Sequence, residues 1–228
     1  MTAETISAES PAQTPAATPD WADQAEQRVL DAAIVLAPDL GWGSRMLARA
    51  AAQACLSAGE AILLLPNGPR DLAALLSGRH DQAAMTALAG VDSKTLKMRD
   101  RIRRGVEARL DAAEVDAPAV RRWAGFLTLP QNLPLALRLT WESADRIWRW
   151  AGDTATDENH YSKRAILSGI LLSCLAIRLH GGPAAASEYL DARIENVMAF
   201  EKWKAGIKPA DYARMVAEAL GRLRYGRG

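Results

Sequence analysis

The chain has 228 residues, of which 49% are apolar, and its 28 Lys and Arg nearly balance 27 Asp and Glu to a net charge of +1. That length favours one domain of roughly 180–200 residues plus a tail. The near-zero charge excludes a chain that binds polyanions along its whole surface. No run of about 18 apolar residues is present, so we expect no membrane-spanning segment. Cys55 and Cys174 lie in apolar contexts typical of buried thiols.

Residues 1–20 are rich in Ala, Thr, Ser and Pro and hold no Lys or Arg, which predicts a disordered leader and neither a signal peptide nor a basic transit peptide. After residue 20, abundant Ala and apolar spacing near 3.6 residues predict an all-α fold. Turn residues separate the helices, as at Pro66-Asn67-Gly68-Pro69 and Gly181-Gly182-Pro183. We expect about ten helices, with candidates at 21–36, 44–52, 57–65, 69–77, 80–89, 93–114, 117–128, 133–151, 157–180, 185–204 and 209–224.

Residues 21–78 resemble the helix-turn-helix unit of TetR-type regulators, with Ser44 and Ser57 as expected N-caps. Residues 79–206 would then form the helical ligand domain. The would-be recognition helix, 57–65, has no Arg, Lys, Asn or Gln to contact bases or phosphates, and it carries Glu60. The pattern therefore predicts a vestigial unit with no nucleic acid partner. A DNA-binding TetR-type regulator with a hydrophobic effector pocket is the alternative function.

The helix expected at 157–180 is apolar around most of its circumference, and the helices at 133–151 and 185–204 offer facing apolar stripes. Ordinary core packing and the wall of a lipid pocket both fit this pattern. Small residues at Ser168, Gly169 and Ser173 favour the pocket slightly, because they leave room for a ligand. The candidate lipid-binding residues are Leu133, Leu137, Trp141, Ala144, Trp148, Ile166, Ile170, Leu171, Cys174, Ile194, Val197 and Met198.

The titratable residues form no catalytic pattern. His80, His160 and His180 are far apart in the chain, and there is no Glu-x-x-His pair, Cys-His cluster or phosphate loop. His160 lies near Glu158, but a solvated residue at a helix start is the preferred interpretation. We therefore expect no enzyme, no cofactor and no metal.

Two stretches are locally basic. Residues 94–104 suit either anionic groups or, as we prefer, a solvated helix face paired with Asp100, Glu107 and Asp111. Residues 207–228 are expected to form an amphipathic helix, with Pro209 in its first turn, that packs on its own domain, on a second subunit or on a membrane surface. The candidate membrane-binding residues are Tyr212, Arg214, Met215, Val216, Leu220, Arg222, Leu223 and Arg224.

Three motifs lie close together in the second half of the chain: Leu129-Pro-Gln-Asn-Leu-Pro134, Trp148-x-Trp-Ala-Gly-Asp153 and Thr156-Asp-x-Asn-x-Tyr-x-x-Arg-Ala165. Gly152 is expected to end a helix with positive φ. Together the motifs resemble the ubiquinone-biosynthesis accessory protein family, whose best-known eukaryotic member is the ninth protein of the coenzyme Q series. The resemblance is strongest over residues 125–200. It implies a TetR-like fold without DNA binding, a pocket for isoprenoid lipids such as a prenylated quinone, and a C-terminal helix that touches a membrane.

The resemblance also implies a partner, the di-iron hydroxylase that acts on demethoxyubiquinone, or an equivalent hydroxylase of the ubiquinone pathway. The family's docking patch corresponds here to Asp153, Thr156, Asp157, Asn159, Tyr161 and Arg164. Of these, Asp157, Tyr161 and Arg164 would share one exposed helix face. His160 belongs to the candidate patch too, but it stands where eukaryotic members carry Trp.

The expected function is that of a non-catalytic accessory protein which presents a prenylated quinone intermediate to a hydroxylase at the membrane. The expected location is cytoplasmic, at the inner membrane of a bacterium, and the mitochondrial matrix face for eukaryotic relatives. A homodimer is one option for the oligomeric state.

Overall fold

The computed structural model describes residues 21–154 and 158–205, and every regular element in these ranges is a helix, which confirms the all-α class. The elements are α1 (Trp21–Leu40), α2 (Ser44–Gln53), α3 (Ala58–Leu64), α4 (Pro69–Leu88), the 3₁₀ turn η1 (Ser93–Thr95), α5 (Met98–Glu114), α6 (Ala117–Leu127), the 3₁₀ turn η2 (Pro130–Asn132), α7 (Leu133–Trp150) and α8 (Glu158–Ala205).

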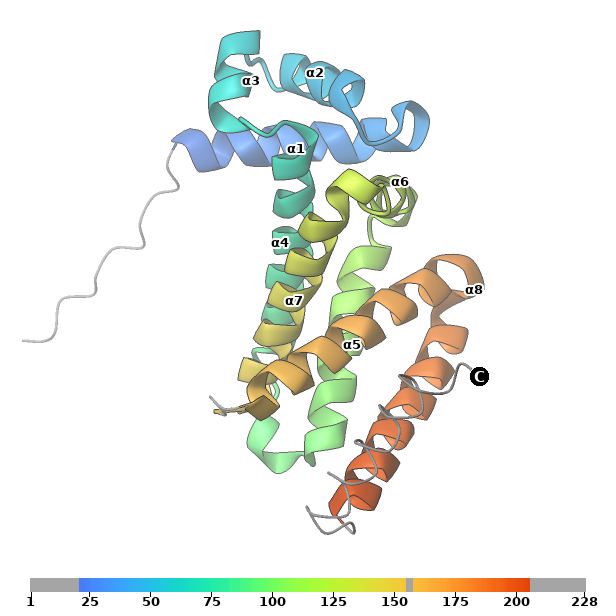
Figure 1. Ribbon diagram of the computed structural model, residues 1–228. Helices are drawn as coiled ribbons and strands as arrows, with labels where there is room; N and C mark the ends of the chain where they lie inside the picture. Colours follow the sequence, from blue (N-terminus) through green and yellow to red (C-terminus); the bar gives the residue numbers. More distant parts are fainter. Residues whose placement is uncertain (1–20, 155–157, 206–228) are drawn as a thin grey trace, which may run out of the picture.

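The helices form two groups along the chain (Figure 1). Helix α1 lies across the end of a bundle of α4, α5 and α7, and α2 and α3 pack beyond α1. Helix α8 crosses α5 and α7 and then turns back on itself. This arrangement is compatible with the expected TetR-like fold. The segments expected to be a leader, 1–20, and a terminal helix, 207–228, lie outside the described residues.

Three expected helix boundaries are wrong. Helices expected at 69–77 and 80–89 are a single helix, α4, because Gly78 is tolerated in its interior at a cost of about 1 kcal/mol and does not end it. The boundary drawn between residues 78 and 79 therefore falls inside a helix. Helix α1 continues through Pro38 to Leu40 and ends at Gly41, whose φ is +75°. The helix expected from residue 93 begins only at Met98, because Leu96 and Lys97 are extended.

Three residues were expected to mark helix starts or ends, and the structure shows which of them do so. Ser57 forms a capping box with Glu60: each side chain bonds the other's backbone N–H, as the sequence led us to expect of Ser57. Ser44 does not cap α2, because the N-cap position is taken by Gly43 without a side-chain bond. Gly152 follows α7 with a φ of +87°, which confirms its expected role.

Helix α8 is broken where Gly181-Gly182-Pro183 predicted a break, since Gly182 has a φ of +83° inside it. The stretch His160–Ala199 is nevertheless long enough, with a mean hydropathy of 1.6 over 18 residues, to cross a membrane by length and composition. This corrects the expectation that no stretch would qualify. A core helix meets the same criterion, and Leu167, Leu171 and Cys174 are buried within this protein.

Two hydrophobic clusters form the core. The first joins α1, α2, α4 and α6 and also includes Leu139 of α7 and Leu179 of α8. The second joins α5, α7 and α8 around Val106, Ile147 and Leu167. Helices α5 and α7 approach closely at Gly105, where a Cβ atom would lie 2.5 Å from Cγ2 of Ile147. The close contact of these helices therefore depends on the missing side chain.

Candidate functional site

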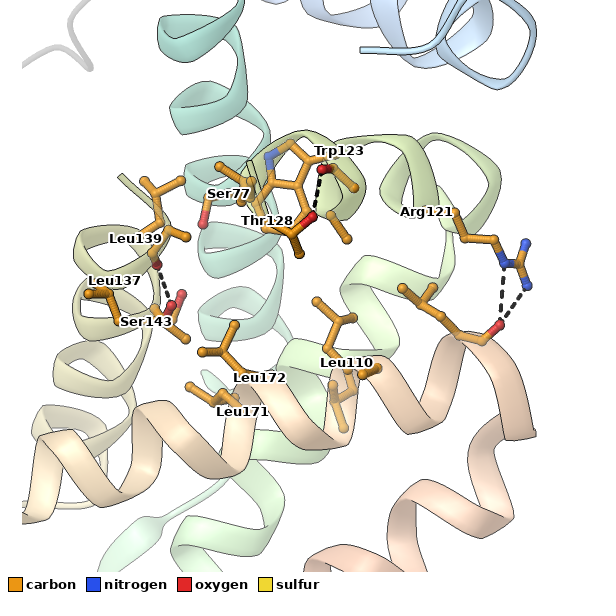
Figure 2. Close-up of a pocket in the computed structure, with 18 of the residues that line it drawn as sticks. Ser77, Leu110, Arg121, Trp123, Thr128, Leu137, Leu139, Ser143, Leu171 and Leu172 are labelled. Carbon is orange, nitrogen blue, oxygen red and sulfur yellow. Dashed lines mark hydrogen bonds between the residues drawn. The ribbon is translucent and has the colours of Figure 1, made fainter. Parts of the chain in front are cut away.

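An apolar cavity of about 620 Å³ lies between α6, α7 and α8, at the seam between the two clusters. Its size is within the range of pockets that hold small organic ligands. Figure 2 shows side chains from these helices surrounding the space, with Trp123 and Thr128 opposite Leu171 and Leu172 of α8. The lining residues are Ser77, Arg109, Leu110, Arg121, Trp123, Ala124, Gly125, Leu127, Thr128, Leu133, Ala136, Leu137, Leu139, Thr140, Ser143, Leu171, Leu172, Leu175, Ala176, Leu179 and His180.

The deep end of the cavity is polar, and we call Ser77, Arg109 and Ser143 its polar floor. All three are buried, and Arg109 is only 7% exposed. Asp81, behind them, accepts hydrogen bonds from Nε of Arg109 at 2.6 Å and from Oγ of Ser143 at 2.6 Å. Arg109 is thus paired with a carboxylate and still lines the cavity.

His80 lies on α4 next to Asp81 and bonds Asp116 through Nε2 at 2.9 Å. Burial, followed by the positive charge of Arg109, lowers the pKa of His80 below its ordinary value, although Asp116 and Asp81 act in the opposite direction. The imidazole is therefore neutral at pH 7, and the charge beside the floor comes from Arg109 and the carboxylates.

The mouth of the cavity is apolar and open to solvent. Leu133 and Leu137 of α7 are 47% and 63% exposed, and Leu172 of α8 is 44% exposed. Exposed leucines gathered at an opening are typical of a surface that meets a ligand or another apolar partner. At another edge, the guanidinium of Arg121 donates to the carbonyl of Leu179 and ties α6 to α8 just before the break at Gly182.

The structure brings three of the twelve expected lipid-binding residues to this cavity: Leu133, Leu137 and Leu171. The others lie elsewhere. Ala144, Ile170 and Cys174 are buried in the second cluster, Trp148, Ile194 and Val197 pack partly buried against it, and Ile166 and Met198 are exposed. Trp141 packs against Tyr161. Gly169 does not line the cavity either, because it lies on the exposed side of α8.

Sequence reasoning missed the contributions of α4, α5 and α6. The apolar spacing of Val120, Trp123, Ala124 and Leu127 marks a helix face that could have been weighed as a second wall. No sequence signal placed Ser77 and Arg109 at the cavity, because their positions depend on how α4 and α5 pack against α7.

The expected docking patch divides into inner and outer residues. Arg164 was expected on an exposed face, but it is 1% exposed. Its Nε donates to Asp145 at 2.6 Å and its Nη1 donates to Asp153 at 3.1 Å, and Lys163 also bonds Asp153 at 2.8 Å. The prediction that Arg164 is exposed is therefore wrong, because two carboxylates, one from α7 and one from the turn after it, bind the guanidinium in the interior.

Asp153 belongs to the same inner network. Burial alone would raise its pKa, but hydrogen bonds from Lys163 and Arg164 lower it below the ordinary value. The carboxylate is therefore charged at neutral pH and joins the start of α8 to the end of α7.

Tyr161 lies on the outside of α8 and is 64% exposed. Its ring lies 6.2 Å from that of Trp141 on α7 and meets His160 edge-on at 5.2 Å. We call Trp141, His160 and Tyr161 the aromatic group. Of the remaining candidates, Thr156 and Asp157 lie outside the described residues, and the side chain of Asn159 is not described.

Two arginines of the basic stretch 94–104 are engaged within the protein. Arg103 pairs with Glu107 at 3.2 Å and with Asp191 at 3.0 Å, and Arg101 donates to the carbonyl of Ala151 at 2.7 Å. The preferred interpretation, a face paired with its own acidic residues, is therefore confirmed at Arg103. Arg101 instead links α5 to the end of α7.

Reactive groups are few in the part of the chain that the structure describes. Those residues contain no cluster of three His, Cys, Asp or Glu side chains that could hold a metal ion. Burial raises the pKa of the Cys174 thiol to about 11, so it is protonated at neutral pH. Cys55 is exposed, with a φ of +58°, and the expectation of a buried thiol is wrong there because it lies in the tight turn after α2.

Comparison with known proteins shows similarity to the COQ9 family. The model of the COQ9 family matches residues 133–201, which cover α7 and most of α8. Three similar proteins carry the name "Ubiquinone biosynthesis protein COQ9, mitochondrial" or the same name with COQ9-B. The protein from Xenopus tropicalis is 31% identical over 65% of this chain and 49% of its own length. The Xenopus laevis COQ9-B protein is 28% identical over 77% of this chain and 63% of its own length. The human protein is 28% identical over 65% of this chain and 48% of its own length.

The chain thus spans about half the length of most of these relatives. The family match includes the α7 and α8 walls of the cavity, the aromatic group and the network around Arg164. The chain is therefore similar to the COQ9 family over α7 and most of α8, as the motifs between Leu129 and Ala165 predicted.

Proposed function

We propose that this protein is a non-catalytic accessory protein of ubiquinone biosynthesis that holds a prenylated quinone or a related isoprenoid lipid in the cavity between α6, α7 and α8. The observation that carries the proposal is the cavity itself, about 620 Å³ and lined mainly by leucines. Two of its walls lie within the part of the chain that matches the COQ9 family.

Burial of an isoprenoid chain supplies the affinity, since each Å² of apolar surface removed from water contributes about 25 cal/mol. A cavity of this size holds a ring and the first part of a chain. The rest of a long chain would leave over Leu133, Leu137 and Leu172, whose exposed surfaces suit an apolar tail.

The aromatic group is proposed as the contact for a hydroxylase of the pathway. Trp141 continues the stripe of Leu133 and Leu137 along α7, because the three are spaced four residues apart. An exposed Tyr against a Trp offers large contact area at low entropic cost, as in many protein interfaces. A partner bound there would lie beside the mouth of the cavity and receive the lipid directly.

A test of lipid binding compares two Trp insertions. Ala136 lines the cavity, so Ala136→Trp should fill it, whereas Gly169→Trp adds the same side chain where a Cβ atom meets open space. After expression in a host that makes ubiquinone, mass spectrometry should detect isoprenoid lipid with the wild-type protein and Gly169→Trp, but not with Ala136→Trp. Equal lipid in both variants would refute the cavity as the binding site.

Membrane contact through residues 207–228 is part of the same proposal. Tyr212, Met215, Val216, Leu220 and Leu223 recur at helical spacing, and the arginines that follow would attract anionic lipid. Removal of these residues should reduce flotation with anionic liposomes. Unchanged flotation would assign membrane contact to another surface.

A further inference from the structure

The polar floor is unusual because it places a buried charged side chain, Arg109, in a cavity lined mainly by leucines. Burying a guanidinium is costly unless it is paired, and Asp81 provides the pairing through Nε. A Leu at this position would close the cavity with apolar contacts at no such cost. The charged pair therefore needs a role besides packing.

The guanidinium has donors that its internal partners do not use. Asp81 takes Nε, and Ser77 is a distant acceptor for Nη2 at 3.4 Å. Nη1 of Arg109 donates no hydrogen bond to any residue within 21–154 and 158–205. Arginine carries five N–H donors in a rigid fork, so one side can bind a carboxylate while the other side serves a ligand.

The charge at the floor favours a neutral ligand oxygen over a charged head. Arg109 and Asp81 balance each other at 2.6 Å, and the next cation, Arg146, lies 3.9 Å from Asp81 and is half exposed. Asp116 faces His80, which is neutral at pH 7. A phosphate would lack the surplus positive charge it needs in a buried site, whereas a carbonyl or phenol oxygen needs only a donor.

We propose that Arg109, positioned by Asp81, donates a hydrogen bond to a ring oxygen of a quinone or phenol head, so that the lipid lies with its head at the polar floor and its tail at the mouth near Leu137. This inference rests on the proposed function, because it assigns an orientation to the lipid in the same cavity. The ring is then shielded from water until the ligand leaves, and Ser77 and Ser143 offer further polar contacts beside it.

The test uses two probes with the same tail, decylubiquinone and decylbenzene, measured by displacement of a polarity-sensitive dye from the full-length protein. The double variant Arg109→Met with Asp81→Leu removes the donor without leaving an unpaired carboxylate. We expect its affinity for decylubiquinone to fall about tenfold or more, since hydrogen bonds to charged groups are among the strong ones. Its affinity for decylbenzene should change less than twofold.

The conservative variant Arg109→Lys decides the matter if the double variant fails to fold. Lysine keeps the charge beside Asp81 but loses the planar fork, so decylubiquinone should again weaken selectively. Unchanged decylubiquinone binding, or an equal loss for both probes, would overturn the role of Arg109. If the wild-type protein binds neither probe, the proposed function fails, whereas equal wild-type affinity for both overturns only the orientation.

Discussion

Arg164 and Tyr161 lie three positions apart on α8, yet one is buried and the other is exposed. The sequence placed them on one face because their helical positions differ by only about 60°. Asp145 and Asp153 lie on the side of Arg164 and hold its guanidinium between α7 and α8. Arg164 therefore stabilises the contact between α7 and α8, whereas Tyr161 remains available at the surface.

Substitution should separate these roles. Arg164→Ala is expected to lower the free energy of unfolding by about 3 kcal/mol, the low end for a broken buried pair, because Lys163 and Arg149 still bond the two carboxylates. Tyr161→Ala should cost less than about 1 kcal/mol but abolish capture of the pathway hydroxylase. Denaturant unfolding and co-purification would measure both. Intact hydroxylase capture by Tyr161→Ala would remove the aromatic group from the proposed interface.

His80 should make stability fall in mild acid. Its folded-state pKa lies below the ordinary value of 6.5, so the unfolded chain takes up a proton first as the pH falls. The stability that His80 contributes is fully present above about pH 6.5. It is lost as the pH falls from about 6.5 through the lower pKa of the folded state. His80→Gln cannot titrate there, so the difference in free energy of unfolding between wild type and variant should shrink from pH 7.5 to pH 5. A constant difference would contradict the lowered pKa.

At the scale of elements, the contact between α5 and α7 depends on a glycine. Gly105→Ala would place a methyl group 2.5 Å from Ile147 and should destabilise the protein by about 1–3 kcal/mol through overpacking. The control is Gly78→Ala in α4, where a Cβ atom meets nothing within 4 Å, and which should stabilise by about 0.4–1 kcal/mol. Thermal denaturation would measure both, and a neutral Gly105→Ala would show that α5 and α7 separate easily.

The helices themselves were largely predictable. Local chemistry fixes the capping box at Ser57, the positive φ of Gly152 and the break at Gly182, and each is visible in the residues alone. The fusion of two expected helices into α4 was not predictable in this way. A single internal glycine weakens a helix but does not end it, and packing of Leu72, Leu76 and Ala84 decides the outcome.

The site was less predictable than the helices. Periodicity identifies the apolar face that holds Leu133 and Leu137, but it cannot say which other helices face it across a cavity. Trp123 and Arg109 come from elements that the sequence assigned no role at the site. The inward turn of Arg164 likewise depends on Asp145, nineteen residues away on another helix.

At the scale of the whole molecule, the cavity joins the two hydrophobic clusters. Leu127, Leu139 and Leu179 belong to the first cluster, Leu110 and Leu171 belong to the second, and all five line the cavity. A bound lipid would therefore complete the contact between the two halves of the core. Loss of the lipid should therefore lower the stability of the whole fold and not only of the residues at the mouth of the cavity.

Thermal unfolding offers a direct measurement. Decylubiquinone at a hundred times its dissociation constant should stabilise the folded state by about 2.7 kcal/mol and raise the Tm by about 5–10 °C for a chain of this size. The Ala136→Trp variant should show no such shift. A wild-type Tm that does not respond to the ligand would contradict binding inside the core.

If the cavity holds the proposed lipid, its position at this seam links the amount of the protein to the supply of that lipid. A chain whose interior is completed by a metabolite spends more time partly unfolded when that metabolite is scarce, and cellular proteases remove such forms. Cells blocked in the early steps of isoprenoid quinone synthesis should therefore contain less of this protein at equal rates of synthesis. In this way the cavity would let the abundance of an accessory protein follow the flux through its own pathway.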